Sequence, residues 1–274
     1  MKRVFAFVLS CAGVSSIAFA QSQTSLPTAT KKEIQLDIEN PIKPAAAVPI
    51  TEEPHHVPVL RNEYVHVFNV TVPGRDATML HQHDLPYLYL TLGTTDIINA
   101  VAGKPEVHMK IEDGTTRYSP GGFAHIARTN GDYLFHNITV ELARPQGSLR
   151  NLGDGSDDRP LGSCPQSTAD PKQKEQSFRP VVPCFETDEL RMDLVSVASG
   201  KDFSEESPRT AALLIAMSDA NLDVTIGEEH AGILHAADVL WLPAGTARRV
   251  SDFLGIRSQF LLISFKDSGA SVSK

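Results

Sequence analysis

The sequence predicts an all-β protein, and three observations carry this prediction. From Asn62 onwards the chain contains short runs of alternating or β-branched residues, such as EYVHVFNVTV at 63–72 and PYLYLTL at 86–92. Gly, Asp and Asn turns separate these runs, which is typical of antiparallel strands. The same texture returns from Leu190 after a polar connector. The sequence therefore indicates two β regions.

The amino terminus has the pattern of a secretory signal peptide. Residues 1–20, MKRVFAFVLSCAGVSSIAFA, combine a basic start, an apolar run and a small-x-small ending. We expect cleavage after Ala20 and export to the periplasm or the extracellular space. The apolar run is short and broken by serines, so we expect no membrane anchor after cleavage.

The charge of the chain narrows the class of partner. The sequence has 33 acidic and 25 basic residues and a formal charge of −8, which becomes −10 when Lys2 and Arg3 leave with the signal peptide. An acidic surface repels nucleic-acid phosphates and anionic headgroups. We therefore expect neither nucleic acid nor an anionic membrane as a partner.

We divide the remaining chain into four parts. Residues 21–58 form a Pro- and Ala-rich arm with little periodicity, and residues 59–145 form the first β region. Residues 146–186 form the polar connector, and residues 187–274 form the second β region. A connector of this length is uncommon inside a compact domain, so we interpret it as a linker between two domains.

The chain without its signal peptide has two cysteines, Cys164 and Cys184, both in the connector. In an oxidising compartment the simplest expectation is one disulfide between them. Closing such a loop stabilises a fold by about 3 kcal/mol in the chain-entropy treatment. Two free thiols are the alternative. The spacing is far from Cys-x-x-Cys, so we do not expect a redox-active pair.

The two β regions resemble each other. TVPGRDATMLHQH around Gly74 is similar to SVASGKDFSEESPR around Gly200, and TTRYSPGGFAH around Pro120 is similar to DVLWLPAGTAR around Pro243. The offsets are 126 and 123 residues. A near-constant offset at two separate places indicates an internal duplication.

Two motifs in the first β region resemble those of the cupin superfamily. The first consists of Gly74, His81, His83, Tyr87 and Gly93, and the second of Gly114, Pro120, Gly122, His125 and Asn130. The resemblance covers both regions and implies a bicupin, with two double-sheet, jelly-roll β-barrels and a metal in the mouth of a barrel. The first motif departs from the family in one longer spacer and in a tyrosine at the family's Glu position. Cupin-like barrels often pair, so a homodimer is the assembly that the resemblance suggests.

The spacing of the histidines gives a physical reason for a metal site. Side chains at i and i+2 of a strand share a face, so His81 and His83 point the same way, and Tyr87 would follow if the pleat continued through Pro86. His125, after a tight Pro-Gly-Gly turn, would add a third imidazole. Three neutral imidazoles suit one divalent Fe, Mn, Zn, Cu or Ni ion with open positions. A structural, hydrogen-bonded histidine pair is the alternative.

Tyr87 is the candidate catalytic residue. A phenol with an ordinary pKa of about 10 is a poor anionic ligand at neutral pH, so we expect it to donate a hydrogen bond to a bound ligand. The alternative is an aromatic that merely lines the barrel. Losing the carboxylate leaves the metal with more positive charge, which favours an anionic substrate. Among the remaining histidines, we expect His55 and His56 to be exposed, and His66 and His136 lie on predicted strands from which they could line the same cavity.

The second β region lacks these ligands. Ser207-Pro208-Arg209 aligns with the His-Gln-His segment, and Arg248 replaces His125. We expect this region to bind no metal and to serve packing, dimerisation or anion binding through Arg248 and Arg249.

The sequence thus predicts an exported protein that holds one metal ion and acts on a small polar or anionic substrate. The expected activity is that of a dioxygenase-like oxidoreductase or a Lewis-acid enzyme. The alternative is a non-catalytic exported module that binds a small molecule or the metal itself, since fold alone does not decide function. Serine-hydrolase, zincin, phosphate-loop and dinucleotide motifs are absent from the sequence.

Overall fold

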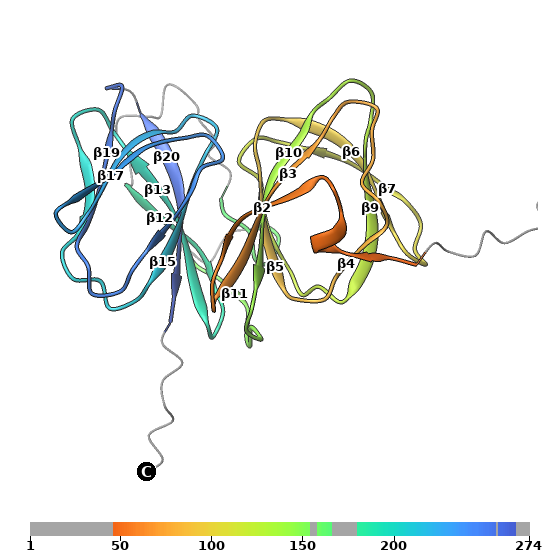
Figure 1. Cartoon of the computed structure of the whole chain (residues 1–274), viewed down its shortest axis with the longest axis horizontal. Helices are drawn as coiled ribbons and strands as arrows, with labels where there is room; N and C mark the ends of the chain where they lie inside the picture. The colour runs from red at the N-terminus through yellow and green to blue at the C-terminus, as the bar shows by residue number, and fades with distance from the viewer. Residues whose placement is uncertain (1–45, 154–157, 166–179, 256, 267–274) are drawn as a thin grey trace, which may run out of the picture. The chain divides into compact units, whose positions relative to one another are not determined.

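The computed structural model describes residues 46–153, 158–165, 180–255 and 257–266 (Figure 1). Within these residues the regular structure is β-strand, apart from one short 3-10 helix, η1 (Ile50–Glu52). The all-β prediction is confirmed. No helix in this part of the chain is long and apolar enough to cross a bilayer. The predicted signal peptide, most of the arm and the middle of the connector lie outside the described residues.

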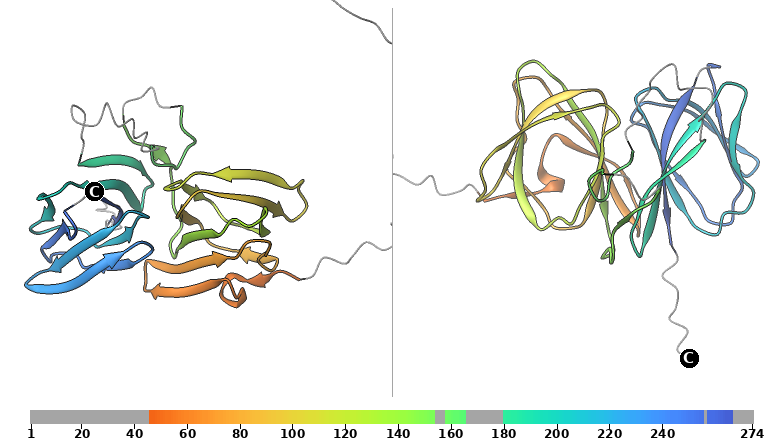
Figure 2. Two further views of the ribbon diagram at one scale, coloured as in Figure 1. Left: turned by 90° about the horizontal axis from the view of Figure 1, so that it is seen from above. Right: turned by 180° about the vertical axis from the view of Figure 1, so that it is seen from behind.

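Residues 48–142 form two five-stranded sheets around one interior (Figure 2). The first sheet runs in the order β1 (Val48–Pro49), β4 (His81–His83), β9 (Phe123–Thr129), β6 (Thr95–Val101) and β7 (Val107–Ile111). The second runs in the order β2 (His56–Arg61), β3 (Val65–Val72), β10 (Phe135–Leu142), β5 (Tyr87–Thr91) and β8 (Thr116–Ser119). One hydrophobic cluster combines Phe68 of β3 with Ile97 of β6 and Ala127 of β9, so the two sheets pack face to face.

Two strands of this half come from the segment that the sequence places in the arm. β1 pairs in parallel with β4, with Val48 opposite His81, and the boundary expected at residue 58 falls inside β2. β2 is an edge strand whose Val57 and Val59 are 56% and 45% exposed. Its side chains therefore do not alternate between core and solvent, and the periodicity that reveals a strand is missing.

The chain changes sheet between the two halves of the first motif. β4 ends at His83, β5 begins at Tyr87, and the two strands lie in different sheets. The pleat is therefore not continuous through Pro86. The turn between β8 and β9 packs against the link between β4 and β5, and it needs a glycine there. A Cβ at Gly121, where φ is +70°, would lie 2.1 Å from the carbonyl oxygen of Leu85.

Ten strands of the described residues between Arg150 and Phe265 form two further sheets. One runs in the order β11 (Arg150–Asn151), β12 (Val181–Glu186), β13 (Leu190–Val197), β20 (Ser258–Phe265), β15 (Ala212–Ala216) and β18 (Val239–Leu242). The other runs in the order β14 (Asp202–Glu205), β19 (Arg248–Asp252), β16 (Asn221–Ile226) and β17 (Glu229–His235). The orders β4-β9-β6-β7 and β14-β19-β16-β17 correspond strand by strand, as do β3-β10-β5-β8 and β13-β20-β15-β18. This correspondence agrees with the offset found in the sequence, while the domain boundaries stay a prediction.

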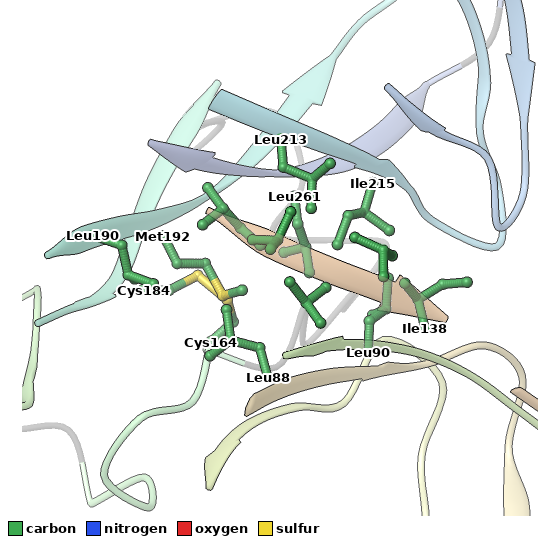
Figure 3. Close-up of a cluster of buried hydrophobic side chains, with 14 of the residues drawn as sticks. Leu88, Leu90, Ile138, Cys164, Cys184, Leu190, Met192, Leu213, Ile215 and Leu261 are labelled. Carbon is green, nitrogen blue, oxygen red and sulfur yellow. A yellow bond between two sulfur atoms is a disulfide. The ribbon is translucent and has the colours of Figure 1, made fainter. Parts of the chain in front are cut away.

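The largest hydrophobic cluster takes side chains from both halves. Figure 3 shows Leu88, Leu90 and Ile138 of the first half with Leu190, Met192, Leu213, Ile215 and Leu261 of the second. Cys164 and Cys184 belong to the same cluster and form a disulfide. The predicted pairing is therefore present, and the bond is buried against the core.

Candidate metal centre

β4 and β9 bring three histidines together inside the first pair of sheets. His81 and His83 occupy alternate positions of β4, and His125 lies opposite His81 on the antiparallel β9. The Nε2 atom of His83 is 3.2 Å from the Nε2 atom of His81 and 3.2 Å from that of His125. His81 and His83 are 1% and 2% exposed. The predicted ligand residues therefore meet in one buried place.

The outer nitrogens of two rings are held by acceptors. Nδ1 of His81 donates to the carbonyl oxygen of Met79 at 2.9 Å, and Nδ1 of His125 donates to Oδ1 of Asn99 at 2.7 Å. A carbonyl oxygen cannot donate, so each Nδ1 carries the proton and each Nε2 offers a lone pair. Both lone pairs lie 3.2 Å from Nε2 of His83, which could donate a proton to only one of them, whereas a divalent ion would accept a lone pair from all three nitrogens. This donor set fits a divalent metal ion.

The electrostatics of the cluster keep the rings neutral. Burial lowers the pKa of His81 to about 4, with the neighbouring His56 adding to the effect. Burial lowers the pKa of His83 to about 2 and that of His125 to about 3, and in both cases the other imidazoles of the cluster reinforce the shift. Neutral imidazole is the form that binds a metal, so the cluster is ready to bind at neutral pH.

A fourth histidine stands beside this cluster, and the sequence did not reveal it. His56, the first residue of β2, is 6% exposed, and its ring centroid lies 4.6 Å from that of His81. One ligand atom from each of His56, His81 and His83 lies within 4.8 Å of the other two. The expectation that His56 is exposed is wrong, because its ring packs against those of Phe68, His81 and His83, and His55 is partly buried.

Glu53 holds His56 in place. Its Oε2 accepts from Nδ1 of His56 at 2.5 Å, and its Oε1 accepts from Nδ1 of His55 at 2.9 Å and from the backbone N–H of Met79 at 3.2 Å. Burial alone would raise the pKa of Glu53, but the hydrogen bonds from His56 and His55 outweigh it and lower the pKa to about 2. Glu53 is thus a buried carboxylate, 1% exposed, that stays ionised at neutral pH.

The histidines open onto a cavity of about 80 Å³, which has room for a few waters or a small ligand beside an ion. Its lining combines six apolar residues with ten polar ones, which are the four histidines, Thr78, Tyr87, Tyr89, Asn99, Asn137 and Thr139. None of the described lining residues is a Lys, Arg, Asp or Glu. A metal ion would therefore be the only full charge facing a ligand in the described part of the cavity.

No protein-family model and no curated protein matches the sequence, but solved structures do. AerE from Microcystis aeruginosa superposes with a TM-score of 0.52 at 9% identity, covering 78% of this chain and 99% of its own. Salicylate 1,2-dioxygenase from Pseudaminobacter salicylatoxidans gives 0.54 at 10% identity, covering 74% and 71%. A variant of that enzyme in complex with gentisate gives 0.55 at 10% identity, covering 77% and 74%. These neighbours are cupin-fold proteins.

The chain has the cupin fold. The resemblance seen in its motifs is thereby confirmed at the level of the fold. At identities near 10% the cupin likeness does not extend to activity or to ligand.

Tyr87 occupies the position where the cupin motif has its carboxylate ligand. Its side chain packs against His83 and stays neutral, unlike a carboxylate ligand. Its ring stacks on the His83 ring at 4.2 Å between centroids and an angle of 21°. Burial raises the pKa of Tyr87 to about 12, although a hydrogen bond with Ser119 opposes the shift. At neutral pH the side chain is a neutral phenol, 7% exposed, that packs against a histidine.

A second buried carboxylate lies behind His83. Oε1 of Glu141 is 3.8 Å from Nδ1 of His83, which is buried without a hydrogen-bond partner, and Oε2 is 3.7 Å from Nδ1 of His66. Burial raises the pKa of Glu141 to about 7, and the nearby Asp84 contributes to this shift. His66 therefore lies near the site, and His136, which shares a hydrogen bond with Asn69, is partly buried.

The second pair of sheets carries an ion pair where the first pair has the histidine cluster. Arg248, the first residue of β19, is 3% exposed and donates through Nε to Oε2 of Glu205 on β14 at 2.5 Å. Arg249 donates to Asp202 in the same way. The described residues of this half contain no cluster of metal-ligating side chains. The sequence comparison aligned Ser207-Pro208-Arg209 with the residues of β4. In the structure the strand that corresponds to β4 is β14, which ends at Glu205, before this segment begins.

Proposed function

We propose that the chain binds one divalent transition metal through the Nε2 atoms of His81, His83 and His125 and uses it to act on a small anionic molecule. The activity we propose is that of a dioxygenase-like oxidoreductase or a Lewis-acid enzyme. The observation that carries the proposal is the polarity of the rings. Nδ1 of His81 and of His125 donates outward, so both rings offer an Nε2 lone pair on the side of His83, and one Nε2–H of His83 could satisfy only one of them.

The charge of the cavity supports an anionic ligand. A divalent ion bound to three neutral imidazoles keeps its full charge, and the described lining offers no carboxylate to offset it. In a poorly hydrated cavity a carboxylate or phenolate on the ligand would be strongly attracted. Salicylate and gentisate, the molecules named with two of the structural neighbours, are aromatic carboxylates that carry hydroxyl groups. We propose ligands of this chemical class as the first to test.

The bound ion, the polar lining residues and Tyr87 would have separate roles. A bound ion would supply Lewis acidity and, if it is Fe or Mn, a site for dioxygen chemistry. Tyr89, Asn137 and Thr139 line the cavity and can orient a polar group of the ligand. Thr139 donates to Oδ1 of Asn137 at 2.9 Å, which leaves the Asn137 amide N–H groups to donate to a ligand oxygen. The Tyr87 ring fixes His83 by stacking.

Metal analysis tests the site. Protein isolated from the exported fraction should contain about one metal ion per chain, and replacing His81 and His83 with alanine should remove it while the fold persists. His108→Gln is a matched control, because His108 is exposed and bonds Asp96 away from the cluster. If folded wild-type protein carries no metal and binds none on titration, the proposal is wrong.

Oxygen consumption tests the chemistry. Metal-loaded protein is mixed with a panel of hydroxybenzoates and aliphatic hydroxy acids, and oxygen uptake is recorded with an electrode. We expect uptake that depends on the metal and disappears in the His81→Ala, His83→Ala variant. Binding without turnover or isomerisation across the panel would contradict the enzymatic part of the proposal.

The second candidate is a non-catalytic module that binds a small molecule or the metal. It is favoured by one observation, namely that the described lining contains no Asp, Glu, Lys or Arg that could transfer a proton. Calorimetric titration of ligands into metal-loaded protein separates the two candidates. Tight binding with an unchanged ligand recovered afterwards would favour the module.

We also propose that the protein works outside the cytoplasm. The disulfide between Cys164 and Cys184 supports an oxidising compartment. Fractionation of cells that express the full chain should place the processed protein in the periplasm or the medium. Recovery of an unprocessed chain in the cytoplasm would contradict export.

A further inference from the structure

We propose that His56 is a fourth nitrogen ligand of the metal and that Glu53 holds it in place. This inference rests on the proposed three-histidine site and adds to it a residue from outside both cupin motifs. His56 lines the same cavity as His81, His83 and His125. One ligand atom of His56 lies within 4.8 Å of one from His81 and one from His83.

The hydrogen bonds of Glu53 determine which nitrogen of His56 faces the cluster. The two carboxylate oxygens accept from the backbone N–H groups of His55 at 2.9 Å and Met79 at 3.2 Å, so they act as acceptors. Nδ1 of His56, at 2.5 Å from Oε2, must then be the donor. In the neutral ring the proton then sits on Nδ1 and Nε2 carries the lone pair, as in a metal-bound imidazole that is oriented by a carboxylate.

The same carboxylate orients a second ligand through Met79. The backbone N–H of Met79 donates to Glu53, and the carbonyl oxygen of Met79 accepts from Nδ1 of His81. Glu53 therefore fixes His56 directly and His81 through one intervening residue. A buried carboxylate with this pair of connections is more than a support for the turn after η1.

The fourth nitrogen replaces the carboxylate that the first motif lacks. Tyr87 stacks on His83, so it does not supply an oxygen ligand of negative charge. His56 approaches from β2, on the other sheet, and supplies a neutral nitrogen instead. The negative charge that the missing carboxylate ligand would have supplied lies instead on Glu53, which bonds the far side of the His56 ring. Four imidazoles favour Zn, Cu or Ni over Mn, because Mn binds such nitrogen donors most weakly among the divalent first-row metals and Ni, Cu and Zn bind them more tightly.

The test counts nitrogens and measures affinity. Metal-free protein is loaded with Cu(II), and the nitrogen couplings are read by electron paramagnetic resonance, with X-ray absorption of the Zn(II) form as a second count. Wild-type protein should show four imidazole nitrogens, and His56→Gln should show three. A wild-type spectrum with three imidazoles overturns the inference without the need for any variant.

Affinity is measured by competition with a chelator of known strength. His56→Gln should bind Zn(II) about 100-fold or more weakly, and Glu53→Gln about 10- to 100-fold more weakly, the range found for partners behind a ligand. His55→Gln is the matched control, since His55 also bonds Glu53 but lies outside the cluster. It should change affinity less than about 3-fold.

The outcomes separate this inference from the proposed function. If His81→Gln abolishes binding while His56→Gln leaves affinity and nitrogen count unchanged, the three-histidine site stands and the fourth ligand is wrong. If wild-type protein binds no metal, both are wrong. If His56→Gln and His55→Gln weaken binding equally, His56 acts through the packing of the turn and the inference is wrong.

Discussion

Acid should unfold the metal-free protein through its buried histidines. Burial lowers the pKa of His81 to about 4, of His83 to about 2 and of His125 to about 3, from 6.5 in the unfolded chain. Between pH 6.5 and pH 4 the unfolded chain therefore binds up to three protons that the folded chain does not. The free energy of unfolding falls as pH falls through this window, because protons stabilise only the unfolded state.

The magnitude follows from the number of protons. Each proton bound only by the unfolded chain changes the free energy of unfolding by about 1.4 kcal/mol per pH unit, so three give about 4 kcal/mol per unit. A total stability of about 5–15 kcal/mol would then be largely lost near pH 4. Glu141 titrates in the same window with the opposite sign, since burial raises its pKa to about 7. The quantity to compare is therefore the pH dependence of the unfolding free energy in the wild type minus that in a variant without these histidines, since Glu141 contributes to both.

The assay is chemical denaturation of chelator-treated protein at intervals between pH 7.5 and pH 4.5. The reference is a variant in which His81, His83 and His125 are all glutamine. Below about pH 5.5, where the unfolded histidines are nearly all protonated, the slope of unfolding free energy against pH should be steeper in the wild type by about 4 kcal/mol per unit. A difference below the value for one proton, about 1.4 kcal/mol per unit, would refute the reasoning.

Three further outcomes are expected. Glu141→Gln should stabilise the metal-free protein by about 3 kcal/mol at pH 8 and by nothing below pH 4.5, because ionising this buried carboxyl costs the folded state about that much; equal stability at pH 8 would contradict its burial. Replacing Cys164 and Cys184 with serine should cost about 3 kcal/mol in denaturant unfolding, and an unchanged midpoint would mean that the disulfide contributes nothing. Tyr87→Phe should leave metal affinity within about 3-fold, since the ring that stacks on His83 is retained; a loss as large as that of a ligand variant would show that the hydroxyl binds the metal.

The three-histidine cluster was predictable because its causes are local. His81 and His83 are two residues apart on one strand, so the pleat alone puts them on one face. His125 follows a turn whose Pro-Gly-Gly sequence is readable, and antiparallel pairing brings β9 against β4. Strand periodicity and turn chemistry were thus sufficient for this part of the site.

The fourth histidine was not predictable because its position depends on tertiary pairing. His56 is buried against the rings of His81 and His83, which come from another sheet, while the exposed Val57 and Val59 hide the strand pattern. The only local hint is Glu53, three residues before His56. The place of Tyr87 was uncertain for a related reason, since no periodicity tells whether a strand continues through Pro86 or moves to the other sheet.

The pairing of β1 with β4 has a consequence for how the protein would acquire the proposed metal. The residues around the cluster are spread from Val48 to His125, and no short segment contains enough of them to hold an ion. If the chain is exported as proposed, the part that emerges first would lack β9 and could not complete the site. Selection of the metal would then occur only after the sheets close, so the ions of the compartment where folding ends, and not those where synthesis occurs, would decide which metal the protein carries.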